Sequence, residues 1–136
     1  EYIIEYFASR GHRCIAIDLR GYGNSDKPYT GYDYDRMAMD IKLVIDALKL
    51  SDITLVGHSM GGAICLRYMS KFNEDKVSRL CLLSAVAPKW VQSSNWLYGY
   101  TVDEVNKLID SFKSDKPKAI IDTSESFFIN LLVKVY

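Results

Sequence analysis

The sequence has no excess of charge of either sign and no long apolar run. Seventeen Lys and Arg residues balance seventeen Asp and Glu residues in 136 positions. This balance argues against a nucleic acid or an anionic membrane as partner, because proteins that bind these usually carry an excess of basic residues. No apolar run reaches the roughly 18 residues that a membrane-spanning helix needs, and no signal-peptide pattern opens the sequence. The first residue is Glu1 and not Met, so we expect the natural N-terminus to lie upstream of it.

Cysteine and histidine are both scarce. The cysteines stand far apart among apolar residues, at Cys14, Cys65 and Cys81, and neither of the two histidines has ligand spacing from any of them. This pattern predicts buried, reduced thiols in a cytoplasmic protein. It offers no metal site, and we expect neither a metal ion nor a cofactor.

Residues 1–87 alternate between helical periodicity and short apolar runs. The spacing of apolar side chains predicts helices over residues 1–10, 34–50 and 60–72, with a glycine-rich loop at 20–33. Three short apolar runs predict buried strands at Arg13–Asp18, Ile53–Val56 and Arg79–Ser84. Strands that alternate with helices predict an α/β fold, with a mostly parallel sheet flanked by helices.

Residues 88–136 have a helical pattern instead. Thr101 and Glu104 have the spacing of a capping box with an apolar stripe behind them, and Pro117 occupies a position that suits the start of another short helix. A last helix is predicted from the apolar residues Phe127, Phe128, Leu131, Leu132 and Val135. We therefore expect two parts, an α/β part at 1–87 and a helical part at 88–136. The aromatic residues of the second part either form its own core or line an apolar pocket.

A G-x-S-x-G pattern occurs at Gly57-His58-Ser59-Met60-Gly61. It follows a predicted buried strand and opens a predicted helix, which is the placement of a nucleophile elbow. Such a turn holds its central serine in a strained backbone conformation with the side chain projecting. The alternative interpretation is that the segment is only a tight strand-to-helix turn.

The elbow hypothesis gives these residues distinct roles. Ser59 is the candidate nucleophile, and the amide of Met60, at the start of a helix, is the candidate hydrogen-bond donor to an oxyanion. Gly57 and Gly61 are expected to let the two arms of the turn pass close together, because neither has a Cβ atom. Gly62 belongs to the same turn.

Two segments together resemble the α/β-hydrolase family. The segment from Asp18 to Pro28 (DLRGYGNSDKP) resembles the loop after the fourth strand of that family, and the elbow GHSMGG follows it in the chain. The resemblance covers residues 1 to about 88 and implies a partial α/β-hydrolase core. Residues 88–136 then resemble the start of a helical cap. Serine at the elbow implies esterases, lipases and related enzymes that form an acyl-enzyme on a small-molecule acyl substrate.

The resemblance also implies catalytic groups that this sequence does not contain. Family members supply a histidine near the C-terminus, an acid after the seventh or the sixth strand, and a second oxyanion donor before the first helix. Neither histidine of this sequence fits the first role. His12 opens a predicted strand whose far end is the active one, and His58 adjoins Ser59 and is expected to pack under the turn. Asp18 and Asp26 stand near the active edge, in a loop that is structural in resembling proteins.

Three functions follow and stay open. The first is a serine hydrolase of the esterase type, which acts through an acyl-enzyme on Ser59. The second is an acyltransferase or a cofactor-free perhydrolase of the same fold. The third is a catalytically silent member that binds a ligand or a partner. The rest of its own domain is a further expected partner.

The resemblance implies the order of the strands as well. The family order 4-3-5-6 makes Arg13–Asp18 the fourth strand and leaves the third strand outside this sequence. The strand before the elbow is then expected to pair with Arg79–Ser84. An empty slot is expected between the strand before the elbow and Arg13–Asp18.

Overall fold

The computed structural model describes residues 2–86 and 88–132, with side chains described as far as Ser124. The chain divides into two compact units, residues 1–87 and residues 88–136. In its described part the first unit contains three helices and two strands, and the second unit contains two helices.

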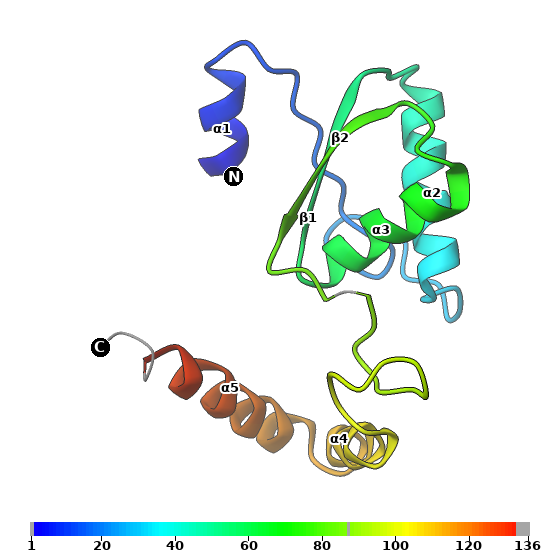
Figure 1. Cartoon of the computed structure of the whole chain (residues 1–136). Helices are drawn as coiled ribbons and strands as arrows, with labels where there is room; N and C mark the ends of the chain where they lie inside the picture. The colour runs from blue at the N-terminus through cyan, green and yellow to red at the C-terminus, as the bar shows by residue number, and fades with distance from the viewer. Residues whose placement is uncertain (1, 87, 133–136) are drawn as a thin grey trace. The chain divides into compact units, whose positions relative to one another are not determined.

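The first unit is built around a strand–helix–strand segment. Its elements are α1 (Tyr2–Ala8), α2 (Tyr34–Ala47), β1 (Ile53–His58), α3 (Met60–Phe72) and β2 (Val77–Leu83). Strands β1 and β2 pair in parallel, which confirms the pairing predicted for the strand before the elbow. Helices α2 and α3 lie together on one side of the two strands (Figure 1).

A small apolar core joins α2 and α3 to the strands. Four buried residues of α2 repeat at helical spacing and meet the fully buried Ile64 and Tyr68 of α3. Ile53 and Leu55 of β1 pack against this cluster. The Tyr68 hydroxyl donates a hydrogen bond to the Asp75 carbonyl oxygen at 2.7 Å, so the buried ring keeps a partner for its polar end.

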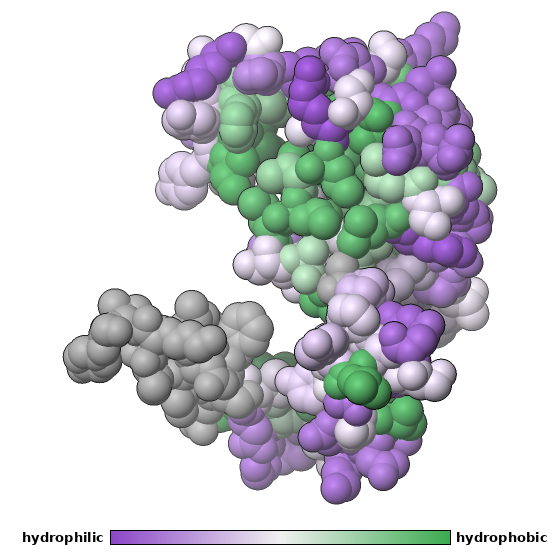
Figure 2. All heavy atoms as spheres, viewed as in Figure 1, coloured by the Kyte–Doolittle hydropathy of each residue, from purple (hydrophilic) through white to green (hydrophobic). Residues whose placement is uncertain are grey.

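The opposite face of the strands carries apolar side chains without cover. Figure 2 shows apolar surface gathered where β1 and β2 lie. Val56 pairs with Cys81 and His58 pairs with Leu83, and ladder partners point to the same face of a sheet. Val56 and Leu83 are 55% and 42% exposed. Parallel sheets are usually covered on both faces, so this face has the composition of a buried one.

One edge of β1 is unpaired within the described residues. The amide of Ile53 donates to the Lys76 carbonyl oxygen, and the amide of Ser59 donates to that of Leu83, each at 3.0 Å. Because the hydrogen-bonding direction alternates along a strand, every second residue between these two positions directs its amide to the other edge. These residues are Thr54, Val56 and His58.

The prediction of a strand at Arg13–Asp18 is wrong for the described residues. The segment is irregular, with none of the backbone ladder bonds that define a strand. Ile15 and Ile17 are 41% and 39% exposed. An apolar run becomes a strand only when a neighbour pairs with it, and no described strand does so. The order 4-3-5-6 with its empty slot remains a prediction.

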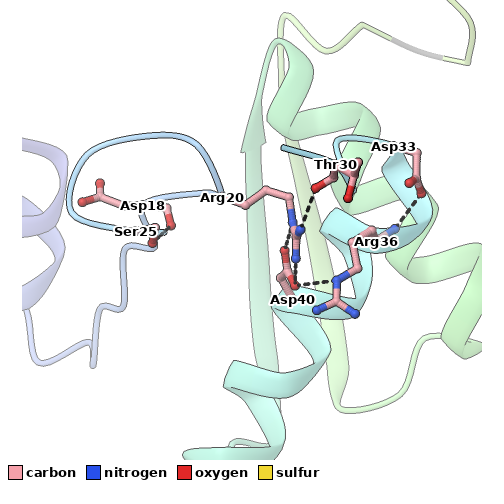
Figure 3. A network of polar contacts seen from close by, with 7 residues as sticks. All are labelled: Asp18, Arg20, Ser25, Thr30, Asp33, Arg36 and Asp40. Carbon is pink, nitrogen blue, oxygen red and sulfur yellow. Dashed lines mark hydrogen bonds and ion pairs between the residues drawn. The ribbon is translucent and has the colours of Figure 1, made fainter. Parts of the chain in front are cut away.

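Arg20 fixes the loop that follows Asp18 onto α2 (Figure 3). Its Nε and Nη2 atoms donate to the two carboxylate oxygens of Asp40 at 2.5 and 2.7 Å, and Nη1 donates to the Thr30 carbonyl oxygen at 3.5 Å. The hydrogen bond that Arg20 donates to Asp40 raises the pKa of Arg20. The Asp18 carboxylate accepts a hydrogen bond from the Asn24 amide at 2.9 Å, so its polar contact is within the loop.

The second unit contains α4 (Val102–Ser114) and α5 (Lys116–Leu132). The capping box is confirmed, because Thr101 and Glu104 exchange side-chain to backbone hydrogen bonds at 3.2 and 2.7 Å. One continuous helix replaces the two that were predicted after Asp115. Pro117 lies in its first turn, where proline is tolerated. The side chains of Phe127, Phe128, Leu131 and Leu132, and all of Val135, lie outside the described residues.

A surface ion-pair group joins α2 to α3. The carboxylate of Asp35 accepts hydrogen bonds from Arg67 Nε at 2.7 Å and Lys71 Nζ at 3.0 Å. The bond from Arg67, and next that from Lys71, lower the pKa of Asp35 to about 2. A carboxyl whose pKa is lowered by folding stabilises the folded state fully above its unfolded pKa of about 4, and this contribution is lost as the pH falls to about 2.

We expect Asp35→Asn to lower the melting temperature slightly at pH 7, since exposed ion pairs contribute little. The difference from the unchanged chain should shrink between pH 4 and pH 2. Thermal unfolding followed by circular dichroism at pH 7, 4 and 2 measures it. Asp26→Asn is the matched control, because no ion pair to Asp26 exists among the described residues. A difference for Asp35→Asn that is the same at all three pH values would contradict the prediction.

Candidate functional site

Ser59 lies at the junction of β1 and α3, in a backbone conformation that residues other than glycine rarely adopt. Its φ is 51° and its ψ is −120°, which costs on the order of 1–3 kcal/mol for a residue with a Cβ atom. Three backbone hydrogen bonds of 3.0 Å fix this conformation. The Ser59 amide donates to Leu83, and the Ser59 carbonyl oxygen accepts from the amides of Gly62 and Val86. The surrounding structure therefore holds the strain in place.

The close approach at this turn involves Gly57 and Gly62, which corrects the expectation for Gly61. A Cβ atom on Gly57 would lie 2.5 Å from the Gly61 carbonyl oxygen, and one on Gly62 would overlap the Ala85 side chain. A Cβ atom on Gly61 would meet nothing within 4 Å apart from its chain neighbours and the backbone of its own helix. Gly61 is therefore a neighbour in the contact, through its backbone, and its own side-chain position is open.

Two amides at the start of α3 have no acceptor among the described residues. Of the first amides of the helix, that of Gly62 bonds to Ser59, whereas those of Met60 and Gly61 have no such bond. The Ser59 side chain makes no capping bond to either. Free amides at a helix N-terminus carry partial positive charge and suit an anionic oxygen. The arrangement thus places Ser59 beside two amides that are available as donors.

The two histidines do not interact with the Ser59 side chain in the described part of the chain. His58 is an exposed residue at the end of β1, so the expectation that it packs under the turn is wrong. The reason is its position in the strand, since its ladder partner Leu83 also lies on the uncovered face. The His12 ring packs edge-on against Phe7 at 5.7 Å between centroids. Within the described residues neither histidine forms a hydrogen bond with Ser59.

The buried cysteine of α3 is no candidate nucleophile, and the described residues contain no metal site. Cys65 is buried in α3, and burial raises the pKa of its thiol to about 11, which keeps it protonated at neutral pH. In the described part of the chain, no group of three or more His, Cys, Asp or Glu residues could hold a metal ion. The helices described there include none that is long and apolar enough to span a membrane.

Sequence reasoning missed the residues that support the elbow from β2 and the segment after it. Leu83, Val86 and Ala85 supply an acceptor, a donor and a small side chain against Gly62. The one available signal was the small residue Ala85 just after the third predicted strand. Its partner in the fold was not evident from local spacing.

The chain was compared with known families and proteins. A profile of the family described as alpha/beta hydrolase fold matches residues 1–133. The chain belongs to this family. AB hydrolase superfamily protein YisY of Bacillus subtilis is 45% identical over 128 residues, which are 94% of this chain and 48% of the relative. A non-heme chloroperoxidase of Streptomyces lividans is 33% identical over 123 residues, which are 90% of this chain and 45% of the relative.

A solved structure agrees with this assignment to the α/β-hydrolase fold. An esterase from Exiguobacterium antarcticum matches with a TM-score of 0.84 and 46% identity, over 91% of this chain and 46% of its own. The α/β-hydrolase chain thus spans about half the length of the relatives that it matches.

We expect Gly57→Ala to destabilise the first unit by about 1–3 kcal/mol, because the added methyl group meets backbone atoms that cannot rotate away. Urea unfolding at 25 °C, followed by circular dichroism, measures the loss. Gly61→Ala is the matched control, since its methyl group enters open space. A Gly57→Ala chain with the unfolding midpoint of the unchanged chain would show that the turn is looser than described.

Proposed function

We propose that the protein is a serine hydrolase that acts on ester-like acyl substrates through an acyl-enzyme on Ser59. The observation that carries the proposal is the strained Ser59 beside the unpaired amides of Met60 and Gly61. The match to the family profile and the likeness to the Exiguobacterium antarcticum esterase add support.

The chemistry has two steps. The Ser59 oxygen attacks the substrate carbonyl carbon, and the carbonyl oxygen becomes an oxyanion that the Met60 amide stabilises by a hydrogen bond. A base takes the proton of the Ser59 hydroxyl and gives it to the leaving oxygen, so that an alcohol departs and an acyl ester on Ser59 remains. Water attacks this ester, the acid is released and the serine is restored. Both steps need a base, which we assign to a histidine outside this sequence, as the family resemblance implies.

A perhydrolase or an acyltransferase is the alternative within the same fold. These activities share the acyl-enzyme and differ in the second nucleophile, which is hydrogen peroxide or an acceptor alcohol in place of water. The likeness to the Streptomyces lividans chloroperoxidase favours the peroxide reaction among these. Peracid formation from acetate and hydrogen peroxide would distinguish it. A silent ligand-binding member would give neither product.

The second unit is proposed to be the start of a cap over the substrate. Its aromatic rings pair with one another, Trp90 with Tyr100 and Trp96 with Tyr98, at 5.3 and 5.1 Å between centroids. Trp90, Tyr98 and Tyr100 nevertheless stay 47%, 72% and 46% exposed, so these contacts form no buried core and both alternatives stay open.

The three cysteines are free, but only Cys65 is buried, whereas Cys14 is half-buried and Cys81 is exposed, so the expectation of buried thiols is wrong for two of them. A place in the cytoplasm stays a proposal.

A chimera tests the assignment of the nucleophile. In it, residues 2–132 replace the matching part of the Exiguobacterium antarcticum esterase. We expect a fluorophosphonate probe to modify Ser59, because the attack on phosphorus uses the same oxygen and the same amides. Mass spectrometry of the digested protein locates the adduct. Ser84→Ala, at another serine with positive φ, is the matched control and should leave labelling unchanged. Labelling that persists in Ser59→Ala would refute the proposal.

The chain alone is expected to hydrolyse a short-chain nitrophenyl ester no faster than its Ser59→Ala variant. In another serine hydrolase, loss of the catalytic histidine costs about 10⁶-fold in turnover, and neither described histidine bonds to Ser59. The assay compares both proteins with the chimera under the same conditions. Turnover of the chain near that of the chimera, and dependent on Ser59, would mean that a base exists within these residues.

A further inference from the structure

Ala85 lies against Gly62 in the first turn of α3. A Cβ atom on Gly62 would be 3.0 Å from the Ala85 Cα atom and would overlap the Ala85 methyl group. The contact therefore holds one methyl group and has no room for a second. Both residues belong to the first unit, where Gly62 is part of α3 and Ala85 follows β2.

The residues on both sides of Ala85 bind the backbone of Ser59. The Leu83 carbonyl oxygen accepts a hydrogen bond from the Ser59 amide, and the Val86 amide donates one to the Ser59 carbonyl oxygen, each at 3.0 Å. The segment after β2 thus fixes Ser59 by two hydrogen bonds, and through Ala85 it also touches the helical turn that begins at this residue.

The contact is tight enough to matter for an oxyanion donor. Carbon atoms that are not bonded rest about 3.5–4.0 Å apart, so a methyl group on Gly62 would have to move away from Ala85 by on the order of 1 Å. Met60 belongs to the same turn as Gly62, so its amide would move as well. A donor acts on an oxyanion from about 2.7–3.1 Å, and a displacement of about 1 Å can cost about 10²-fold in rate.

We propose that Ala85 is a positioning residue for the reaction, because its methyl group holds the first turn of α3 where the Met60 amide meets the oxyanion. The inference rests on the proposed acyl-enzyme at Ser59. An oxyanion forms only as the serine attacks, so a donor that is displaced from it lowers kcat and leaves KM nearly unchanged. A change that widens or loosens the contact between Ala85 and Gly62 therefore slows turnover in a protein that is still folded.

The experiment exchanges the methyl group between the two residues in the chimera. Gly62→Ala adds a second methyl group to the contact, Ala85→Gly removes the one that is there, and the double variant moves it from residue 85 to residue 62. With p-nitrophenyl acetate, kcat should fall about 10- to 100-fold in Gly62→Ala and about 3- to 10-fold in Ala85→Gly. The double variant should return to within about threefold of the unchanged chimera, and KM should stay within about threefold throughout. Thermal unfolding of each variant, followed by circular dichroism, shows that it is folded at the assay temperature.

Loss of kcat in the single variants with recovery in the double variant supports the inference. A purely structural contact would lower the melting temperatures of the single variants and leave kcat of the folded proteins unchanged, which overturns it. A double variant as slow as Ala85→Gly also overturns it. If Gly62→Ala does not fold, Ala85→Gly and the double variant decide by the same criteria, since Ala85→Gly adds no atom to the contact. Hydrolysis that survives in the Ser59→Ala chimera would instead refute the proposed function, whatever the result for Ala85.

Discussion

The hydrogen bonds at Ser59 are the constraint on which the site depends. Leu83 accepts from its amide, and Val86 donates to its carbonyl oxygen. Both partners belong to β2 or to the residues just after it, so the strained serine exists only where β1 and β2 have already paired in this register. The parallel pairing in turn requires that α3 cross between the strands, because a short hairpin cannot join parallel strands. Sheet, helix and turn therefore form as one structural element.

The core beneath α3 connects this turn to the rest of the first unit. Ile64 and Tyr68 are completely buried against α2, and Met60 packs on the same cluster. Met60 thereby has two uses: its side chain anchors the first turn of the helix, and its amide remains available at the end. A change in the packing of α2 would move the donor relative to the Ser59 oxygen. The pair of Arg20 and Asp40 adds a polar attachment of the preceding loop to the same helix.

The sequence predicted best the features that depend on neighbours along the chain. The helices at α2 and α3, the capping box at Thr101 and the pairing of the strands flanking α3 are confirmed, because periodicity and capping act over a few residues. The errors concern contacts between distant segments. Arg13–Asp18 has the composition of a strand but no described partner.

The two errors at the turn have the same origin. Gly62 is tightly packed because of Ala85, which lies on the far side of α3 in the chain. His58 is exposed because its position in the β1 ladder places it on the uncovered face. Neither result could be obtained from the spacing of residues within the motif alone.

The edge of β1 that is unpaired within the described residues has a consequence for the chain during its synthesis. Thr54, Val56 and His58 direct their amides outward, and Val56 belongs to an apolar face. A strand edge of this kind recruits any extended chain that meets it, including another copy of itself. Correct folding and aggregation therefore compete for the same row of amides, and the outcome depends on the local concentration of newly made chains. A chaperone that covers β1 would slow the second process without touching Ser59.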